Sequence, residues 1–310
     1  MKNTHWAQQA ERGNLFFLNI TRWIVTYLPL WAIRTVTFIV VCYFFLTSRR
    51  ARRNISCYQQ RLRRQFPFLR LPRAAVFRAF LAFGESITDR FAVWQHKIHY
   101  TDLIVDDADR LYADIAQHGH GQILVCSHLG NIEICRALIK SGQHREDFKL
   151  NGLVHSRNAE AFNKALEQAG ADPLPLIQVE ALDAQKMLQL HNCIARGEWI
   201  AIAADRVPLR GDKTAAVDFL GDKAYFPQGA WLLASLLKAP LNTIFSLKEK
   251  NKYRLKLRKF SPPIQGRGSV RSQNIQLAMQ HYADLLAQEC ANHPLQWFNF
   301  YDFWDDHEKN

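Results

Sequence analysis

The chain has 310 residues, of which 48% are hydrophobic and 22% are charged. This balance excludes an intrinsically disordered protein, and the length suffices for one large globular domain or two modest ones. The formal net charge of +12 at pH 7 indicates an acidic partner, and composition alone leaves open whether this is nucleic acid, anionic lipid or an acidic protein.

The first predicted element is an apolar stretch from Trp23 to Thr47, which contains one charged residue, Arg34, and one proline, Pro29. A helix needs about 20 apolar residues to cross a bilayer, so the stretch is long enough, although Arg34 is costly at full depth. The basic cluster at 48–53 follows directly and is typical of a cytoplasmic flank that meets anionic lipid. We therefore expect residues 1–50 to form a membrane anchor, either a single span or a pair of interfacial helices.

Residues 51–310 are predicted to form a folded α/β domain, because short apolar runs alternate with amphipathic segments. Such interleaving argues for a central mixed sheet flanked by helices. The six cysteines have no CxxC pair and no zinc-finger spacing, so we expect reduced, structural thiols in a cytosolic domain. The predicted helices are 58–68, 73–94, 106–118, 132–142, 159–169, 183–196, 228–238 and 271–292, and the predicted strands are 121–127, 149–155, 198–204, 241–248 and 253–260.

The aromatic segment 296–304 follows the last predicted helix. Two placements are open for it, since such a segment can cover the core or touch a membrane surface.

The segment 125–138 contains the main candidate for chemistry. Its buried strand is predicted to end just before His128, and open α/β sheets bind ligands at the carboxyl ends of their strands. With Gly130 forming a turn, Glu133 falls in the first turn of the next helix, where its carboxylate can accept a hydrogen bond from one imidazole nitrogen and raise the basicity of the other. Such a base can deprotonate a hydroxyl that attacks a thioester carbonyl, while free amides at the helix start stabilise the oxyanion. The residues by themselves leave open a chance spacing without a catalytic role.

The sequence SHLGNIE at 127–133 resembles the H-x4-D/E block of the lysophospholipid acyltransferase superfamily, and is similar especially to the bacterial late acyltransferases of lipid A biosynthesis. Residues 153–170, 204–211 and 217–245 resemble the later blocks of these enzymes, in the same order. The apolar N-terminal segment with its basic flank is similar too. Two positions depart from the family pattern: Ile132 stands where an aromatic residue is usual, and Asp205–Arg206 replaces the common Asp–Gln.

The resemblance implies a glycerol-3-phosphate acyltransferase-like fold and an acyltransferase at the bacterial inner membrane, with its catalytic domain facing the cytoplasm. It implies that His128 is the general base and that Glu133 orients it. The residues that it implies for shaping the site and binding substrate are Gly130, Asn131, Arg157, Asp205 and Arg206.

The implied acyl donor is acyl carrier protein or acyl-coenzyme A, and both are acidic, which suits the basic net charge. The implied acceptor is a hydroxyl or amine of a lipid or glycolipid: a lipid A precursor, a lysophospholipid or an aryl-polyene-type lipid. No cofactor and no metal are implied. The densest basic run, beginning at Arg49, lies beside the apolar segment, which favours lipid over nucleic acid as partner. An acyl-thioester hydrolase and a non-catalytic basic membrane-surface protein stay open as alternatives.

Overall fold

A seven-stranded mixed sheet forms the centre of the molecule, as the alternating pattern predicted, in the order β1-β9-β8-β2-β5-β3-β4. The computed structural model describes residues 23, 27–95, 97–116, 119–135, 148–154, 176–178, 183–206 and 213–304. The strands of the sheet are β1 (Leu103–Asp106), β2 (Ile123–Cys126), β3 (Leu150–Val154), β4 (Leu176–Gln178), β5 (Trp199–Ala203), β8 (Leu241–Glu249) and β9 (Lys252–Ser261). A separate antiparallel hairpin, β6 (Thr214–Phe219) and β7 (Asp222–Pro227), was not predicted.

The middle of the sheet is parallel, because β8, β2, β5, β3 and β4 run in one direction. β9 pairs antiparallel with β8, and β1 pairs parallel with β9. All four residues of β2 are buried, since the strand is covered on both faces, which is why it reads as a continuous apolar run. The carboxyl ends of β2, β5 and β8 therefore meet at one edge of the sheet.

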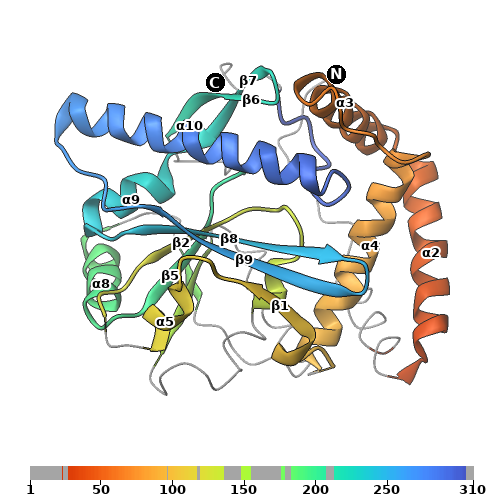
Figure 1. The fold of residues 1–310 in the computed structure, drawn as a ribbon, viewed down its shortest axis with the longest axis horizontal. Helices are drawn as coiled ribbons and strands as arrows, with labels where there is room; N and C mark the ends of the chain where they lie inside the picture. The colour runs from red at the N-terminus through yellow and green to blue at the C-terminus, as the bar shows by residue number, and fades with distance from the viewer. Residues whose placement is uncertain are drawn as a thin grey trace.

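Helices cover both faces of the sheet, and alternate residues of β2 enter different cores. Ile123 and Val125 belong to the core that also contains Leu286 of α10, whereas Leu124 packs with Trp94 of α4 on the other face. Figure 1 shows α10 crossing the sheet, with α2 and α4 side by side at one end of the molecule. The helices are α2 (Leu30–Thr47), α3 (Arg49–Gln65), α4 (Ala75–Trp94), α5 (Leu111–Ala116), α8 (Ala184–Ala195), α9 (Gly229–Leu237) and α10 (Gly268–Asn292), with 3-10 turns η2 (Tyr100–Asp102) and η3 (Ile132–Ile134).

The N-terminal helices α2 and α3 pack against the rest of the molecule. Tyr58 and Leu62 of α3 lie in the core beneath α10. Val41 of α2 is buried against α4 at Gly84, where an added Cβ would lie 2.6 Å from the valine side chain. None of the described helices is by itself long and apolar enough to cross a bilayer, although α2 and α3 together have the required length and composition, with a bend of 91° between them. The predicted anchor is thus unconfirmed.

Candidate active site at the carboxyl edge of the sheet

A tight turn carries the chain out of β2 at residues 127–131. Gly130 has a φ of +77°, a conformation that favours glycine, and an added Cβ would lie 1.9 Å from the carbonyl oxygen of Ser246. Its N–H donates to the carbonyl oxygen of Gln296 at 2.8 Å, and the N–H of Asn131 donates to that of Ser246, also at 2.8 Å. The turn is therefore fixed between β8 and the C-terminal segment. It leaves the His128 side chain 35% exposed.

The imidazole of His128 is hydrogen-bonded to Asp205, which follows β5. Nδ1 lies 2.7 Å from Oδ1 of Asp205, and the backbone N–H of His128 donates to Oδ2 at 2.9 Å. Asp205 is completely buried. Because a carboxylate accepts hydrogen bonds, Nδ1 carries the proton of the neutral ring, and Nε2 is left as the proton acceptor.

Burial and nearby charges set the protonation of this pair. Partial burial of the ring and the Arg206 guanidinium lower the pKa of His128, and the opposing effect of Asp205 does not restore it to its ordinary value. Burial alone would raise the pKa of Asp205, but the interactions with His128 and with Arg206 outweigh it, so this pKa is lowered. Near neutral pH the pair is thus a neutral imidazole beside a carboxylate, which is the state that a general base requires.

Glu133 occupies a different place from the one expected. It lies in η3, a 3-10 turn rather than the predicted start of an α-helix, and its Oε2 accepts a hydrogen bond from Nε1 of Trp94 at 3.2 Å. Among the described residues, the hydrogen bonds and ion pairs of His128 do not include Glu133. The His128 ring is hydrogen-bonded to Asp205, which the family resemblance had placed among the substrate-binding residues, and the orienting role expected of Glu133 stays a prediction.

The backbone amides of the turn at 128–131 are not free to act as oxyanion donors, and the role expected of the amides at the helix start stays a prediction. The N–H groups of His128 and Leu129 donate to Asp205 Oδ2 and Ser127 Oγ, and those of Gly130 and Asn131 donate to backbone carbonyls. All four of these amides are engaged within the protein. Electrophilic stabilisation of a reacting carbonyl therefore has to come from groups other than these four backbone amides.

The remaining predicted residues are placed as follows. The amide nitrogen of the Asn131 side chain donates to the carbonyl oxygen of Ser86 at 3.1 Å. The guanidinium of Arg206 donates to Oδ1 of Asn299 and to the carbonyl oxygen of Phe298, both at 2.7 Å. Arg157 lies outside the described residues.

A pocket of about 190 Å³ opens beside the turn, at the carboxyl end of β8. Its lining includes Gly130 and Asn131 together with Lys248 and Phe298. The amine of Lys248 is paired with Asp89 at 2.7 Å and with Glu85 at 3.2 Å. Gly130 and Asn131 thus border a cavity near His128, and their contact with substrate stays a prediction.

No sequence pattern indicated that the aromatic segment 296–304 reaches this site. Trp297 donates from Nε1 to Oδ2 of Asp205 at 3.2 Å, and the Asn299 side chain donates to the same oxygen at 3.4 Å. Trp297 and Phe303 lie in the main core, so the segment covers the core, one of its two expected placements. The density of aromatic residues was the signal for burial, but no local pattern linked the segment to the histidine.

Comparison with known proteins supports the resemblance read from the motifs. The family model of the bacterial lipid A biosynthesis acyltransferases matches residues 5–305, which is nearly the whole chain. A comparison with curated proteins found no match. The matched region includes β2, β5 and the C-terminal segment, and hence every side chain of the site described above. The chain therefore belongs to the bacterial lipid A biosynthesis acyltransferase family and is an acyltransferase.

Proposed function

We propose that this enzyme transfers a fatty acyl chain from the thioester of acyl carrier protein or coenzyme A to a hydroxyl or amine of a lipid or glycolipid acceptor, with His128 as general base. The observation that carries this proposal is the 2.7 Å contact between Nδ1 of His128 and the buried Asp205, at the carboxyl edge of the sheet. The family supports an acceptor in lipid A biosynthesis. The net charge of +12 favours an acidic donor.

In the proposed reaction Nε2 of His128 accepts the proton of the acceptor hydroxyl while its oxygen attacks the thioester carbonyl. The new C–O bond forms, the tetrahedral intermediate collapses and the C–S bond breaks. The departing sulfur then takes the proton from Nε2, so the ring returns to its neutral state. Asp205 fixes the tautomer and stabilises the imidazolium that forms between the two proton transfers. The substrate contacts expected of Arg157 and Arg206 are also part of the proposal, and Glu133 is the alternative orienting residue that a variant has to test.

The proposal is tested with purified protein, acyl carrier protein carrying a labelled acyl chain, and total envelope lipid. We expect label on a lipid product, identified by mass, with His128→Ala at background. A parallel reaction with labelled acyl-coenzyme A identifies the donor. Release of free fatty acid at an equal rate with and without lipid would indicate a thioester hydrolase instead. Equal transfer by the wild type and His128→Ala would overturn the role of the histidine.

The pH dependence follows from the lowered pKa of His128. Because only the neutral ring accepts a proton, kcat/KM is expected to fall on the acid side with an apparent pKa below the ordinary histidine value of 6.5. Asp205 raises the pKa of the ring, so Asp205→Asn should move this limb to still lower pH. Transfer rates at subsaturating acceptor, measured between about pH 5 and 8, check both shifts. An acid limb above 6.5 would contradict the assignment.

We further propose that α2 lies along the membrane surface rather than across the bilayer. Enzymes of this family are membrane-associated. One face of α2 packs along α4, whereas Trp31, Tyr43 and Leu46 on α2 are more than half exposed. A helix that keeps the folded domain along one side has only its other side available to lipid. The exposed arginines at the start of α3, Arg49 and Arg50, would then meet anionic headgroups.

Replacing exposed apolar residues of α2 is expected to weaken vesicle binding. For Trp31→Ser with Leu46→Ser, we expect a loss of about tenfold or more in affinity for vesicles of phosphatidylethanolamine and phosphatidylglycerol, because two large side chains no longer enter the bilayer. Co-sedimentation at fixed protein concentration measures it. High salt should weaken the wild type as well, since the arginines contribute.

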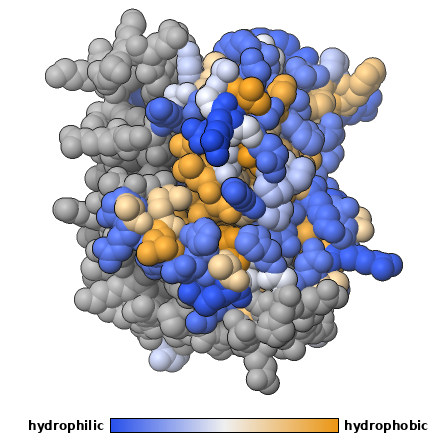
Figure 2. All heavy atoms as spheres, turned by 90° about the vertical axis from the view of Figure 1, so that its left-hand side faces the viewer, coloured by the Kyte–Doolittle hydropathy of each residue, from blue (hydrophilic) through white to orange (hydrophobic). Residues whose placement is uncertain are grey.

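The matched control uses exposed leucines at the end of the molecule away from α2. Leu188 on α8 and Leu236 on α9 are exposed. Figure 1 places α8 and α9 on the side of the molecule away from α2, and Figure 2 shows apolar side chains among hydrophilic ones on that side. Leu188→Ser with Leu236→Ser should leave vesicle binding unchanged. Equal losses in both double variants would show that α2 is not the lipid-facing surface.

A further inference from the structure

A fully buried carboxylate needs hydrogen-bond donors that replace its lost hydration. The C-terminal segment supplies two of the four donors to Asp205. Asp205 is completely buried, so each of its oxygens needs hydrogen-bond donors to remain charged. His128 provides its ring at Oδ1 and its backbone N–H at Oδ2. Two further donors at Oδ2 are the indole N–H of Trp297 and the side-chain amide of Asn299. Trp297 and Asn299 are themselves almost completely buried.

Residues 296–299, here called the C-terminal strap, are attached on both sides of the acid. The N–H of Phe298 donates to the carbonyl oxygen of His128 at 3.0 Å. Arg206 donates to the strap at Asn299 Oδ1 and at the carbonyl oxygen of Phe298. The strap therefore contacts three neighbouring parts of the site: the backbone of His128, the carboxylate of Asp205 and the guanidinium of Arg206.

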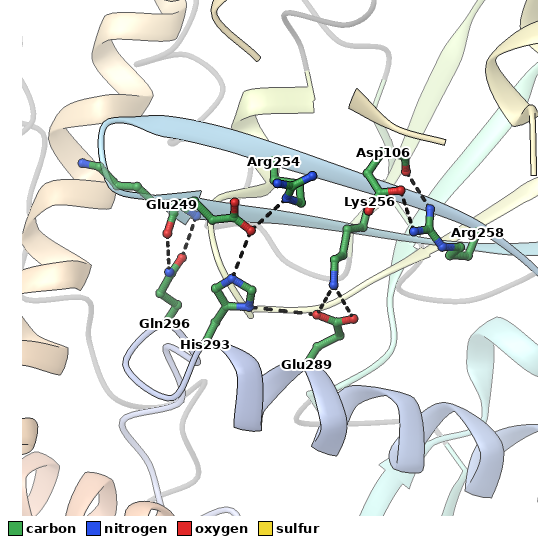
Figure 3. A network of polar contacts seen from close by, with 9 residues as sticks. Asp106, Glu249, Arg254, Lys256, Arg258, Glu289, His293 and Gln296 are labelled. Carbon is green, nitrogen blue, oxygen red and sulfur yellow. Dashed lines mark hydrogen bonds and ion pairs between the residues drawn. The ribbon is translucent and has the colours of Figure 1, made fainter. Parts of the chain in front are cut away.

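The start of the strap is anchored to the β8–β9 hairpin (Figure 3). The Gln296 side chain bonds the backbone of Lys248 twice, accepting at 2.9 Å and donating at 2.8 Å. Just before the strap, His293 lies between Glu249 and Glu289, with its ring nitrogens 3.6 Å and 4.0 Å from their carboxylates. Lys256 of β9 is paired with Glu289 at 2.9 Å. The position of the strap relative to the sheet is thus set by polar contacts independent of the acid.

We propose that Trp297 and Asn299 are positioning residues of the transfer reaction, which hold Asp205 ionised and turned so that Oδ1 faces Nδ1 of His128. This inference rests on the proposed function, because it assigns a role to residues that act through the same pair. Trp297 packs against Tyr58, Phe219 and Phe303, so replacing it by phenylalanine keeps an aromatic ring in the core and removes the N–H donor.

The test compares Trp297→Phe with Trp304→Phe. Trp304 lies seven residues further along the same segment, and its indole N–H donates at 3.2 Å to the carbonyl oxygen of Phe219, away from the acid. We expect Trp297→Phe to lower kcat roughly tenfold with KM little changed, since one hydrogen bond to a charged group is lost. With that donor gone, more negative charge faces the ring, so the acid limb of the pH profile should move to higher pH. Trp304→Phe should move neither kcat nor the profile.

A double-mutant cycle separates positioning from general destabilisation. If Trp297 acts through Asp205, then Trp297→Phe should have no further effect on kcat in the Asp205→Asn background. An additive loss there, an equal loss in Trp304→Phe, or an unchanged kcat in Trp297→Phe would each overturn the inference. Asn299→Ala, measured in the same cycle, provides the answer if Trp297→Phe does not fold.

The same measurements distinguish failure of the inference from failure of the proposed function. Impaired transfer by Asp205→Asn with normal transfer by Trp297→Phe and by Asn299→Ala removes only the role of the strap. Normal transfer by Asp205→Asn removes the catalytic pair itself, and the strap with it.

Discussion

Replacing Asp205 by asparagine is expected to lower the rate of acyl transfer by about 10²–10⁴-fold, which is the range of general-base catalysis by an oriented histidine. The neutral amide can no longer stabilise the imidazolium that forms as Nε2 takes the proton. It also offers an N–H toward Nδ1 as readily as an oxygen, so the ring can adopt the tautomer that protonates Nε2. Steady-state transfer of labelled acyl chain to lipid measures the loss, with circular dichroism to confirm that the variant is folded.

Glu133→Gln is the comparison that decides which carboxylate orients the histidine. Glutamine keeps an oxygen that can accept from Nε1 of Trp94, so we expect a loss much smaller than that of Asp205→Asn. The opposite order, with Glu133→Gln the more impaired variant, would return the orienting role to the residue that the H-x4-E spacing indicates.

The central strands were predictable because each is a short apolar run between breakers. The runs at 121–127, 198–204 and 241–248 correspond to β2, β5 and β8, whereas the alternating segment 253–260 corresponds to β9, which pairs antiparallel with β8. Buried parallel strands give such runs without alternation, and this signal needs no knowledge of neighbours. The four-residue strand β1 was not predicted, since so short a segment has no period of its own, and the predicted helix 106–118 begins at the last residue of this strand.

The amphipathic helix α3 was predicted at 58–68 and instead spans Arg49–Gln65. The arginine-rich run at its start contains a single small apolar residue, Ala51, so hydrophobic spacing did not reveal it, although arginine has a high helix propensity. The hairpin β6–β7 was missed for a related reason. Its first strand, with two adjacent alanines, has little of the alternation that marks a half-buried strand.

The site shows the limit of sequence reasoning more sharply. His128 and Asp205 were both named, each at the end of a predicted strand, but they were assigned to different roles. Their contact depends on β2 lying next to β5 in the sheet. Neither segment by itself predicts which strands are neighbours. The donors Trp297 and Asn299 are further still along the chain, so only the folded structure brings them to the carboxylate.

Replacing Gly130 by alanine is expected to destabilise the protein by about 3 kcal/mol or more. It should also reduce acyl transfer at temperatures at which the variant is still folded. The left-handed φ of +77° accounts for about 1 kcal/mol of this loss. The larger part comes from the added Cβ, which would lie 1.9 Å from the Ser246 carbonyl oxygen and 2.8 Å from its carbon, and must push the turn away from β8. Such a shift also moves His128 relative to Asp205.

Two other glycines separate the causes in the Gly130 variant. Gly221→Ala has the positive φ of +84° but only an ordinary contact, 3.6 Å from the Gln65 side chain, so it should lose about 1 kcal/mol and keep its activity. Gly119→Ala has neither feature, since nothing lies within 4 Å of the added Cβ, and its stability should be unchanged. Urea unfolding of the three variants gives the free energies of unfolding. If Gly130→Ala were no less stable than Gly221→Ala, the close approach of the turn to β8 would contribute nothing. The position of His128 would then have to be set by the Asp205 contacts and the C-terminal strap alone.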